Sequence, residues 1–190
     1  DDTRPVDRVD ASKLQFIAEG VMIEHRSVVN FIEVVKTTAN LSQSDRILQF
    51  ASISFDVAVE EIYPCLTVGG TVFLRTEAML SSFSSFIQKC REWQLTILDL
   101  PTAFWQALIT ELARTKEPFP ESVRLLFVGG ESLLPEKLKL WQQYIEEMLQ
   151  TGKLRRVPQL INAYGPTETT VEATYCDLSN YQLTENCTSV

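Results

Sequence analysis

The chain has 190 residues, and because 45% of them are hydrophobic it can bury a substantial core as one folded domain. Acidic residues outnumber basic ones by 25 to 17, giving a net charge of −8, and no basic block could follow a phosphate backbone, so no nucleic-acid partner is expected. No apolar run approaches the roughly 20 residues that cross a bilayer, and the opening residues lack the apolar centre of a secretory signal. We therefore expect a soluble, cytoplasmic protein with no membrane partner.

Apolar periodicity predicts helices that alternate with strands. The predicted helices cover 27–40, 57–68 and 83–90, a stretch from Thr102, which we expect to cap its helix, and a stretch from Pro135 to about Gly152. Short apolar runs predict strands over 47–53, 71–74, 95–98, 123–128 and 160–163. Strands that alternate with helices form right-handed crossovers around a parallel sheet. We therefore predict an α/β fold, a doubly wound, mostly parallel, flavodoxin-like sheet with helices on both faces.

The cysteine and histidine content argues against two common kinds of site. The four cysteines are widely spaced, so a structural zinc site is not expected. His25 is the only histidine, and a Ser-His-Asp hydrolase or cysteine protease would have to use it as its general base. Cys65 and Cys90 fall within apolar stretches, which predicts buried, reduced thiols.

Polar residues gather after the predicted strands, where the loops of a parallel sheet share one ligand-binding edge. Asp56, Asp99, the turn 129–131 and the segment 162–170 all lie at such places. The last segment reads N-A-Y-G-P-T-E-T-T, and its aromatic ring, tight turn and carboxylate can stack a base, approach phosphate and hold Mg²⁺. A Gly-Pro turn followed by a helix cap explains the same residues without a ligand, so the motif alone leaves both interpretations open.

Four segments together resemble the amino-acid adenylation domains of nonribosomal peptide synthetases, which belong to the AMP-binding, adenylate-forming superfamily. They are G-V-M-I-E-H-R-S at 20–27, S-F-D-V-A-V-E-E-I-Y at 54–63, F-V-G-G-E at 127–131 and N-A-Y-G-P-T-E-T-T at 162–170. The resemblance implies that residues 20–190 are a flavodoxin-like subdomain of an adenylation core, carrying the amino-acid specificity pocket. Residues 1–19 would be an N-terminal extension or truncated flank.

Enzymes of this family are ligases that activate an amino acid with ATP and Mg²⁺ to an aminoacyl adenylate. They then pass the acyl group to the phosphopantetheine thiol of a carrier protein, so the implied partners are an amino acid, a carrier protein and the rest of the adenylation domain. Thr167 would contact the α-phosphate, and Glu168 would help to hold Mg²⁺. The implied cofactor-binding residues, with Tyr164 stacked on adenine, are Gly130, Glu131, Asn162, Tyr164 and Gly165.

The resemblance also implies which residues select the substrate. They are Asp56, Val57, Glu60, Asp99, Phe127, Gly129, Ala163, Val171 and Glu172. Asp56 would pair with the α-ammonium group of the substrate. Glu60, Asp99 and Glu172 are further carboxylates, and carboxylates gathered in a small pocket are costly to desolvate unless a cation or proton is supplied.

We therefore expect a basic substrate side chain. Arginine is the first choice because its planar guanidinium can bind two carboxylates, and lysine or ornithine comes next. The alternative is that Glu60 and Glu172 face solvent, so that Asp99 alone lines a pocket for a polar or phenolic side chain.

The chain departs from the family pattern at both ends. The Gly/Ser/Thr-rich phosphate loop does not precede Gly20, where Phe16-Ile17-Ala18-Glu19 stands, and the family's ribose-binding Asp and catalytic Lys do not appear before Val190. We therefore expect the chain alone to be a poor catalyst. Two other interpretations remain: a relative of acyl- or aryl-CoA synthetases, which needs no ammonium partner at Asp56, and a noncatalytic flavodoxin-like scaffold.

Overall fold

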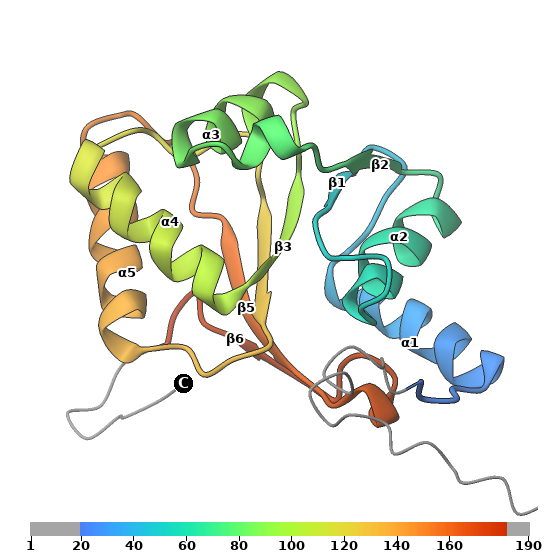
Figure 1. The fold of residues 1–190 in the computed structure, drawn as a ribbon. Coiled ribbons are helices and arrows are strands. Elements are labelled where there is room, and N and C mark those ends of the chain that lie inside the picture. The colour runs from blue at the N-terminus through green and yellow to red at the C-terminus, as the bar shows by residue number, and fades with distance from the viewer. Residues whose placement is uncertain (1–19, 182–190) are drawn as a thin grey trace, which may run out of the picture.

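The computed structural model describes residues 20–181, and Figure 1 shows a central sheet with helices on both sides. The strands are β1 (Arg46–Gln49), β2 (Thr71–Leu74), β3 (Ile97–Pro101), β4 (Leu125–Gly129), β5 (Gln159–Tyr164) and β6 (Thr174–Asp177). The α-helices are α1 (His25–Thr38), α2 (Val57–Thr67), α3 (Phe83–Glu92), α4 (Thr102–Thr115) and α5 (Pro135–Gln150). Two short 3₁₀ helices are η2 (Glu77–Leu80) and η3 (Thr167–Thr169). The predicted flank 1–19 and Cys187 lie outside the described residues.

The order of the strands determines where a ligand can enter. The sheet runs β2-β1-β3-β4-β5-β6, in which β1 to β5 are parallel and β6 is antiparallel to β5. The chain passes from β1 outward to β2 and then returns to the other side of β1 to form β3. The loops that follow β1 and β3 therefore diverge, and this switch point is where doubly wound sheets leave a crevice at the carboxyl ends of their strands.

Two apolar layers form because neighbouring strand residues face opposite sides of the sheet. Leu126 belongs to the larger core cluster, which contains Trp105 of α4 and Trp141 of α5. Its chain neighbour Leu125 packs on the other face with Cys65 of α2. The predicted doubly wound fold is thus confirmed, as is the burial of Cys65 and Cys90. Between residues 20 and 181, no helix has the length and apolar character needed to cross a membrane.

Three local predictions were wrong. Strand β1 ends at Gln49 rather than at residue 53, because the backbone N–H groups of the next two residues bond to a side chain of α2 instead of to a strand. Strand β6 was missed because its side chains are mostly exposed and form no apolar run. Thr102 is not a cap: it is the first residue of α4 after Pro101, and its hydroxyl donates to the carbonyls of Gly129 (3.0 Å) and Glu131 (3.2 Å).

Candidate substrate and nucleotide site

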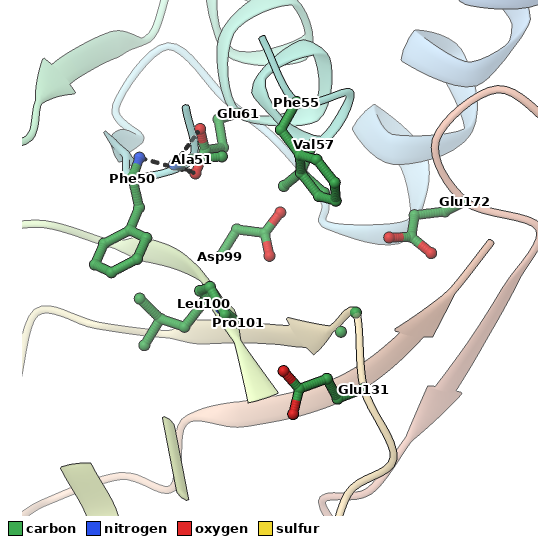
Figure 2. Close-up of a pocket in the computed structure, with 12 residues that line it drawn as sticks. Phe50, Ala51, Phe55, Val57, Glu61, Asp99, Leu100, Pro101, Glu131 and Glu172 are labelled. Carbon is green, nitrogen blue, oxygen red and sulfur yellow. Dashed lines mark hydrogen bonds between the residues drawn. The ribbon is translucent and has the colours of Figure 1, made fainter. Parts of the chain in front are cut away.

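A cavity of about 250 Å³ lies at the switch point between β1 and β3 (Figure 2). Its walls come from the loop between β1 and α2, the end of β3, the turn after β4 and the segment before β6. The residues that line it are Phe50, Ala51, Phe55, Val57, Glu61, Asp99, Leu100, Pro101, Gly129, Gly130, Glu131 and Glu172. This list contains four carboxylates and no lysine, arginine or histidine. The cavity therefore combines apolar walls with carboxyl groups that have no basic partner in its lining.

The loop between β1 and α2 is held by Glu61, which the sequence analysis did not single out. Glu61 is 1% exposed, and its carboxylate accepts the N–H of Phe50 (2.8 Å), the N–H of Ala51 (3.0 Å) and the side-chain amide of Gln49 (3.0 Å). Burial raises the pKa of Glu61, and these hydrogen bonds oppose the rise. Glu61 thereby fixes the backbone that leads into Phe55, Asp56 and the start of α2. The only signal in the sequence was a second carboxylate directly after Glu60.

Asp99 and Glu172 face each other across the cavity. The Asp99 carboxylate points from β3 toward the middle of the space, and Glu172 approaches it from the segment before β6 (Figure 2). Burial raises the pKa of Asp99 well above its ordinary value, and the charges of Glu61 and Glu172 add to the rise. Burial also raises the pKa of Glu172 to about 8, with repulsion from Asp56 as the second cause. Both groups would be stabilised in their charged form by a cation between them.

Glu60 lies behind Asp99 rather than on the wall of the main cavity. It is 4% exposed and lines a small void of about 10 Å³ together with Glu61, Asp99 and Phe127. Its Oε1 accepts a hydrogen bond from the Tyr175 hydroxyl (3.1 Å), while its Oε2 has no partner among the described residues. Burial, followed by the charges of Asp99 and Glu172, raises the pKa of Glu60 well above its ordinary value.

The remaining predicted substrate residues divide between this cavity and its surroundings. Val57 and Gly129 line the main cavity, and a Cβ on Gly129 would lie 2.9 Å from the carbonyl oxygen of Ala163, so this close approach of β4 to β5 requires glycine. Phe127 lines only the void behind Asp99. Asp56, Ala163 and Val171 line a neighbouring cavity, described next.

The second cavity, of about 480 Å³, is lined by the five residues predicted to bind the base and the turn beside it: Gly130, Glu131, Asn162, Tyr164 and Gly165. Tyr164 is 69% exposed, so its ring is open to a planar ligand. A Cβ on Gly165 would lie 2.5 Å from the Cα of Glu172, so only glycine permits the turn after β5. The two cavities share Glu172, Val57 and the Gly130-Glu131 turn, which makes them adjoining halves of one cleft.

The turn that carries Glu172 has an unusual backbone. Thr170 and Val171 have φ angles of 71° and 68°, and the N–H of Glu172 donates to the carbonyl of Thr170 (2.9 Å). Positive φ is costly for β-branched residues and persists only where packing enforces it. Val171 is 4% exposed and packs against Phe31 and Val35 of α1. The contact with α1 therefore holds Glu172 at the cleft.

Thr167 and Glu168 lie in η3, just after the Gly165 turn, and do not line either cavity. Within residues 20–181, no group of three or more His, Cys, Asp or Glu side chains could hold a metal ion. The exposed Glu168 carboxylate fits the way Mg²⁺ is usually bound beside a nucleotide, by one or two carboxylates together with phosphate oxygens. His25 is exposed at the start of α1, away from both cavities.

Comparison with known proteins identifies the family. The sequence pattern of the family described as AMP-binding enzyme matches residues 19–189. The chain belongs to this family. An isonitrile lipopeptide synthase of Streptomyces coeruleorubidus is 35% identical over 165 residues, which are 87% of this chain and 11% of that protein. Gramicidin S synthase 1 of Brevibacillus brevis is 30% identical over 156 residues, 82% of this chain and 12% of that protein. The chain thus spans about a tenth of the length of these relatives.

Solved structures show the same fold at lower identity. The nonribosomal peptide synthetase FmoA3 aligns with a TM-score of 0.73 and 21% identity, over 90% of this AMP-binding chain and 17% of FmoA3. The Vibrio cholerae adenylation domain AlmE, in complex with glycyl-adenosine-5'-phosphate, aligns with a TM-score of 0.66 and 24% identity, over 88% of this chain and 28% of AlmE. These likenesses show that this AMP-binding chain shares the fold of the corresponding part of FmoA3 and of the adenylation domain AlmE.

Proposed function

We propose that this chain is the substrate-selecting part of an enzyme that uses ATP to convert a basic amino acid into an aminoacyl adenylate for transfer to carrier-protein phosphopantetheine. One observation carries the choice of substrate: Asp99 and Glu172 face each other in a cavity of about 250 Å³ that no basic side chain lines. Isolated carboxylates of this kind are costly unless a cation is supplied. The substrate side chain would supply it.

The adjoining cavity suits the nucleotide. The exposed Tyr164 ring would stack on adenine, with Asn162 and the Gly130-Glu131 turn at the base edge. Thr167 would contact the α-phosphate and Glu168 would help to hold Mg²⁺. ATP and Mg²⁺ would supply the activated phosphate and its counter-charge. The adenylation domain AlmE, which has a similar fold, was solved in complex with glycyl-adenosine-5'-phosphate, and this supports an adenylate as the ligand.

The amino acid would bridge the two cavities. Asp56, at the start of α2, lines the nucleotide half and would pair with the α-ammonium group, placing the carboxylate of the substrate near the phosphate. The side chain would then extend toward Asp99 and Glu172. We place arginine first, because a planar guanidinium can donate to both carboxylates, and lysine or ornithine next.

The test is ATP–pyrophosphate exchange by an intact adenylation domain that carries this chain. Arginine, lysine and ornithine should support exchange, and citrulline, a neutral isostere of arginine, should support it at least tenfold less well. Asp56→Asn should depress exchange with every amino acid, since each has an α-ammonium group. If neutral amino acids support exchange and none of the three basic ones does, the basic-substrate proposal is wrong.

A further inference from the structure

Tyr175 connects the edge strand of the sheet by a hydrogen bond to the acidic residues Glu60, Asp99 and Glu172, of which Glu60 is its direct partner. It lies in β6, the antiparallel strand, and its hydroxyl donates to Oε1 of Glu60 on α2 (3.1 Å). Its ring packs against Phe127 with the two centroids 5.8 Å apart. None of the sequence motifs includes Tyr175, and its contact with Glu60 spans 115 positions of the chain. It is nevertheless the one described side chain that hydrogen-bonds to Glu60.

Glu60 has little else to stabilise a charge. The groups that interact with it electrostatically are Asp99 from β3, Glu172 from the segment before β6 and its own neighbour Glu61, all of them acidic. Helix α1 contributes apolar Val35 and Ala39 to the void beside it. Because Glu60 is 4% exposed, water reaches it poorly and the ionised form depends on the groups around it.

We propose, on the basis of the function proposed above, that Tyr175 is a specificity-determining residue: its hydroxyl favours the ionised form of Glu60 behind Asp99 and Glu172, and so increases the preference of the cavity for a cationic side chain. Tyr175 would act through Glu60 and would not touch the substrate, so it is a positioning residue.

The sign of the effect follows from the hydrogen bond. A donor to a carboxylate favours its ionised form, and the Tyr175 contact lowers the pKa of Glu60 against the rise caused by burial. Burial raises the pKa of Tyr175 itself, and the charge of Glu60 adds to that rise, so the hydroxyl keeps its proton and remains a donor. Removing the hydroxyl would leave both oxygens of Glu60 without a donor. The ionised form of Glu60 would then be less favourable, and so would a cationic side chain in the cavity.

The experiment compares Tyr175→Phe with the unmodified protein in an intact adenylation domain that carries this chain. Exchange is measured between pH 6 and 9 with arginine against citrulline and with lysine against norleucine, so that each basic amino acid has a neutral counterpart. We expect the preference for the basic partner to fall about tenfold at pH 7 through KM, with kcat little changed. We also expect the remaining preference to develop at higher pH, because a less stabilised Glu60 ionises later.

Two further variants separate this role from a loss of packing. Tyr144→Phe removes another buried hydroxyl, which donates to the carbonyl of Glu117 on the opposite side of the sheet, and should lower Tm without changing either ratio or the pH profile. Glu60→Gln keeps the size of the side chain and an acceptor for Tyr175 but removes the charge, so it should reduce the preference even if Tyr175→Phe folds poorly. Adding Tyr175→Phe to Glu60→Gln should change the pH profile no further.

The outcomes separate the two proposals. If the unmodified protein shows no preference for basic amino acids, the proposed function fails and this inference fails with it. If the unmodified protein prefers a basic amino acid and Tyr175→Phe keeps both the ratio and the pH profile, the assignment to Tyr175 is wrong while the proposed function stands. Retention of the preference in Glu60→Gln would also overturn the inference, because the hydroxyl is argued to act through that charge.

Discussion

Carboxyl groups at the two ends of the strands have opposite surroundings. At the amino ends of the strands, Asp45 is 3% exposed and accepts two hydrogen bonds of 2.9 Å from Arg124, with further donors from Thr96 and Ser42. At the carboxyl ends, Asp99 and Glu172 line a cavity to which no lysine, arginine or histidine contributes. The first arrangement links neighbouring strands, whereas the second leaves carboxyl groups without a basic partner.

The pKa shifts express the same difference. Burial alone would raise the pKa of Asp45, but the hydrogen bonds from Arg124 and Thr96 outweigh burial and hold the pKa below its ordinary value. Burial raises the pKa of Asp99 as well, and there the neighbouring acids increase the shift. Removing one partner of a buried ion pair is costly because it leaves the other charge unpaired, while a carboxyl group whose pKa is raised in a cleft is a candidate for binding a ligand.

The largest expected effect comes from breaking the ion pair between Asp45 and Arg124 at the amino ends of the strands. Asp45→Asn removes the negative charge that accepts hydrogen bonds from Arg124 and Thr96. It should lower the free energy of unfolding by about 3 kcal/mol, because it leaves a half-buried guanidinium without its counter-ion. Urea unfolding of the 190-residue chain measures this. Glu111→Gln, which removes one partner of the exposed pair with Arg114, is the control and should change little. If both variants lose the same free energy of unfolding, burial does not make the Asp45–Arg124 pair more important than the exposed Glu111–Arg114 pair.

The same substitution at the other edge should act with the opposite sign. Asp99→Asn removes one of several mutually repelling carboxylates and should raise the free energy of unfolding by about 1 kcal/mol at pH 8. In an intact adenylation domain it should weaken the apparent affinity for arginine about tenfold and leave citrulline nearly unchanged, since one charged contact is lost. A destabilised Asp99→Asn would mean that this carboxylate has a structural role like that of Asp45.

The pH dependence of stability should differ between the edges. Glu172 has a folded-state pKa of about 8, above its ordinary value, so between roughly pH 4.5 and 8 the folded chain holds a proton that the unfolded chain has lost. This group therefore makes stability fall as pH rises through that window, with no further loss above it. The lowered pKa of Asp45 acts the other way and withdraws stability only as pH falls through the acid range.

Urea unfolding between pH 5 and 9 at constant ionic strength measures the first of these slopes. Glu172→Gln should make it shallower, although Asp99 and Glu60, whose pKa values are also raised, keep part of it. Asp177→Asn, at an exposed carboxylate with its own hydrogen-bond donors, should leave it unchanged. A slope that is the same in Glu172→Gln and in the unmodified chain would assign the titration to another group.

The smallest expected effect concerns the hydrogen bonds by which Thr102 of α4 holds the turn after β4. Thr102→Val keeps the shape of the side chain but removes the hydroxyl that donates to Gly129 and Glu131, and should cost about 1 kcal/mol of stability. It should also raise KM for the amino acid, because the turn after β4 forms one wall of the cavity. Thr110→Val, at an exposed hydroxyl of the same helix, provides the matched control. No change in either quantity would show that the turn holds its position without Thr102.

Sequence periodicity predicted the layers because they follow from local apolar spacing. The helices and β1 to β5 were found within a few residues, since each carries an apolar face that must be buried. The errors came where a distant side chain decided the backbone. Strand β1 ends early because the Glu61 carboxylate accepts hydrogen bonds from the N–H groups of Phe50 and Ala51. Thr102 does not cap α4, because its hydroxyl donates to the carbonyl of Gly129 at the end of β4. Such contacts cannot be predicted from the spacing of apolar residues.

The sequence by itself determined the doubly wound sheet, the family and the segments that reach the two cavities, because motifs and periodicity are local properties of the chain. Only the tertiary structure decided which acids act together. It placed Asp99 and Glu172 on the cavity wall, set Glu60 behind them in contact with Tyr175, and gave Glu61 to the backbone of a loop. Adjacent and chemically identical, Glu60 and Glu61 received different roles because burial and hydrogen-bond donors come from residues far away in the chain.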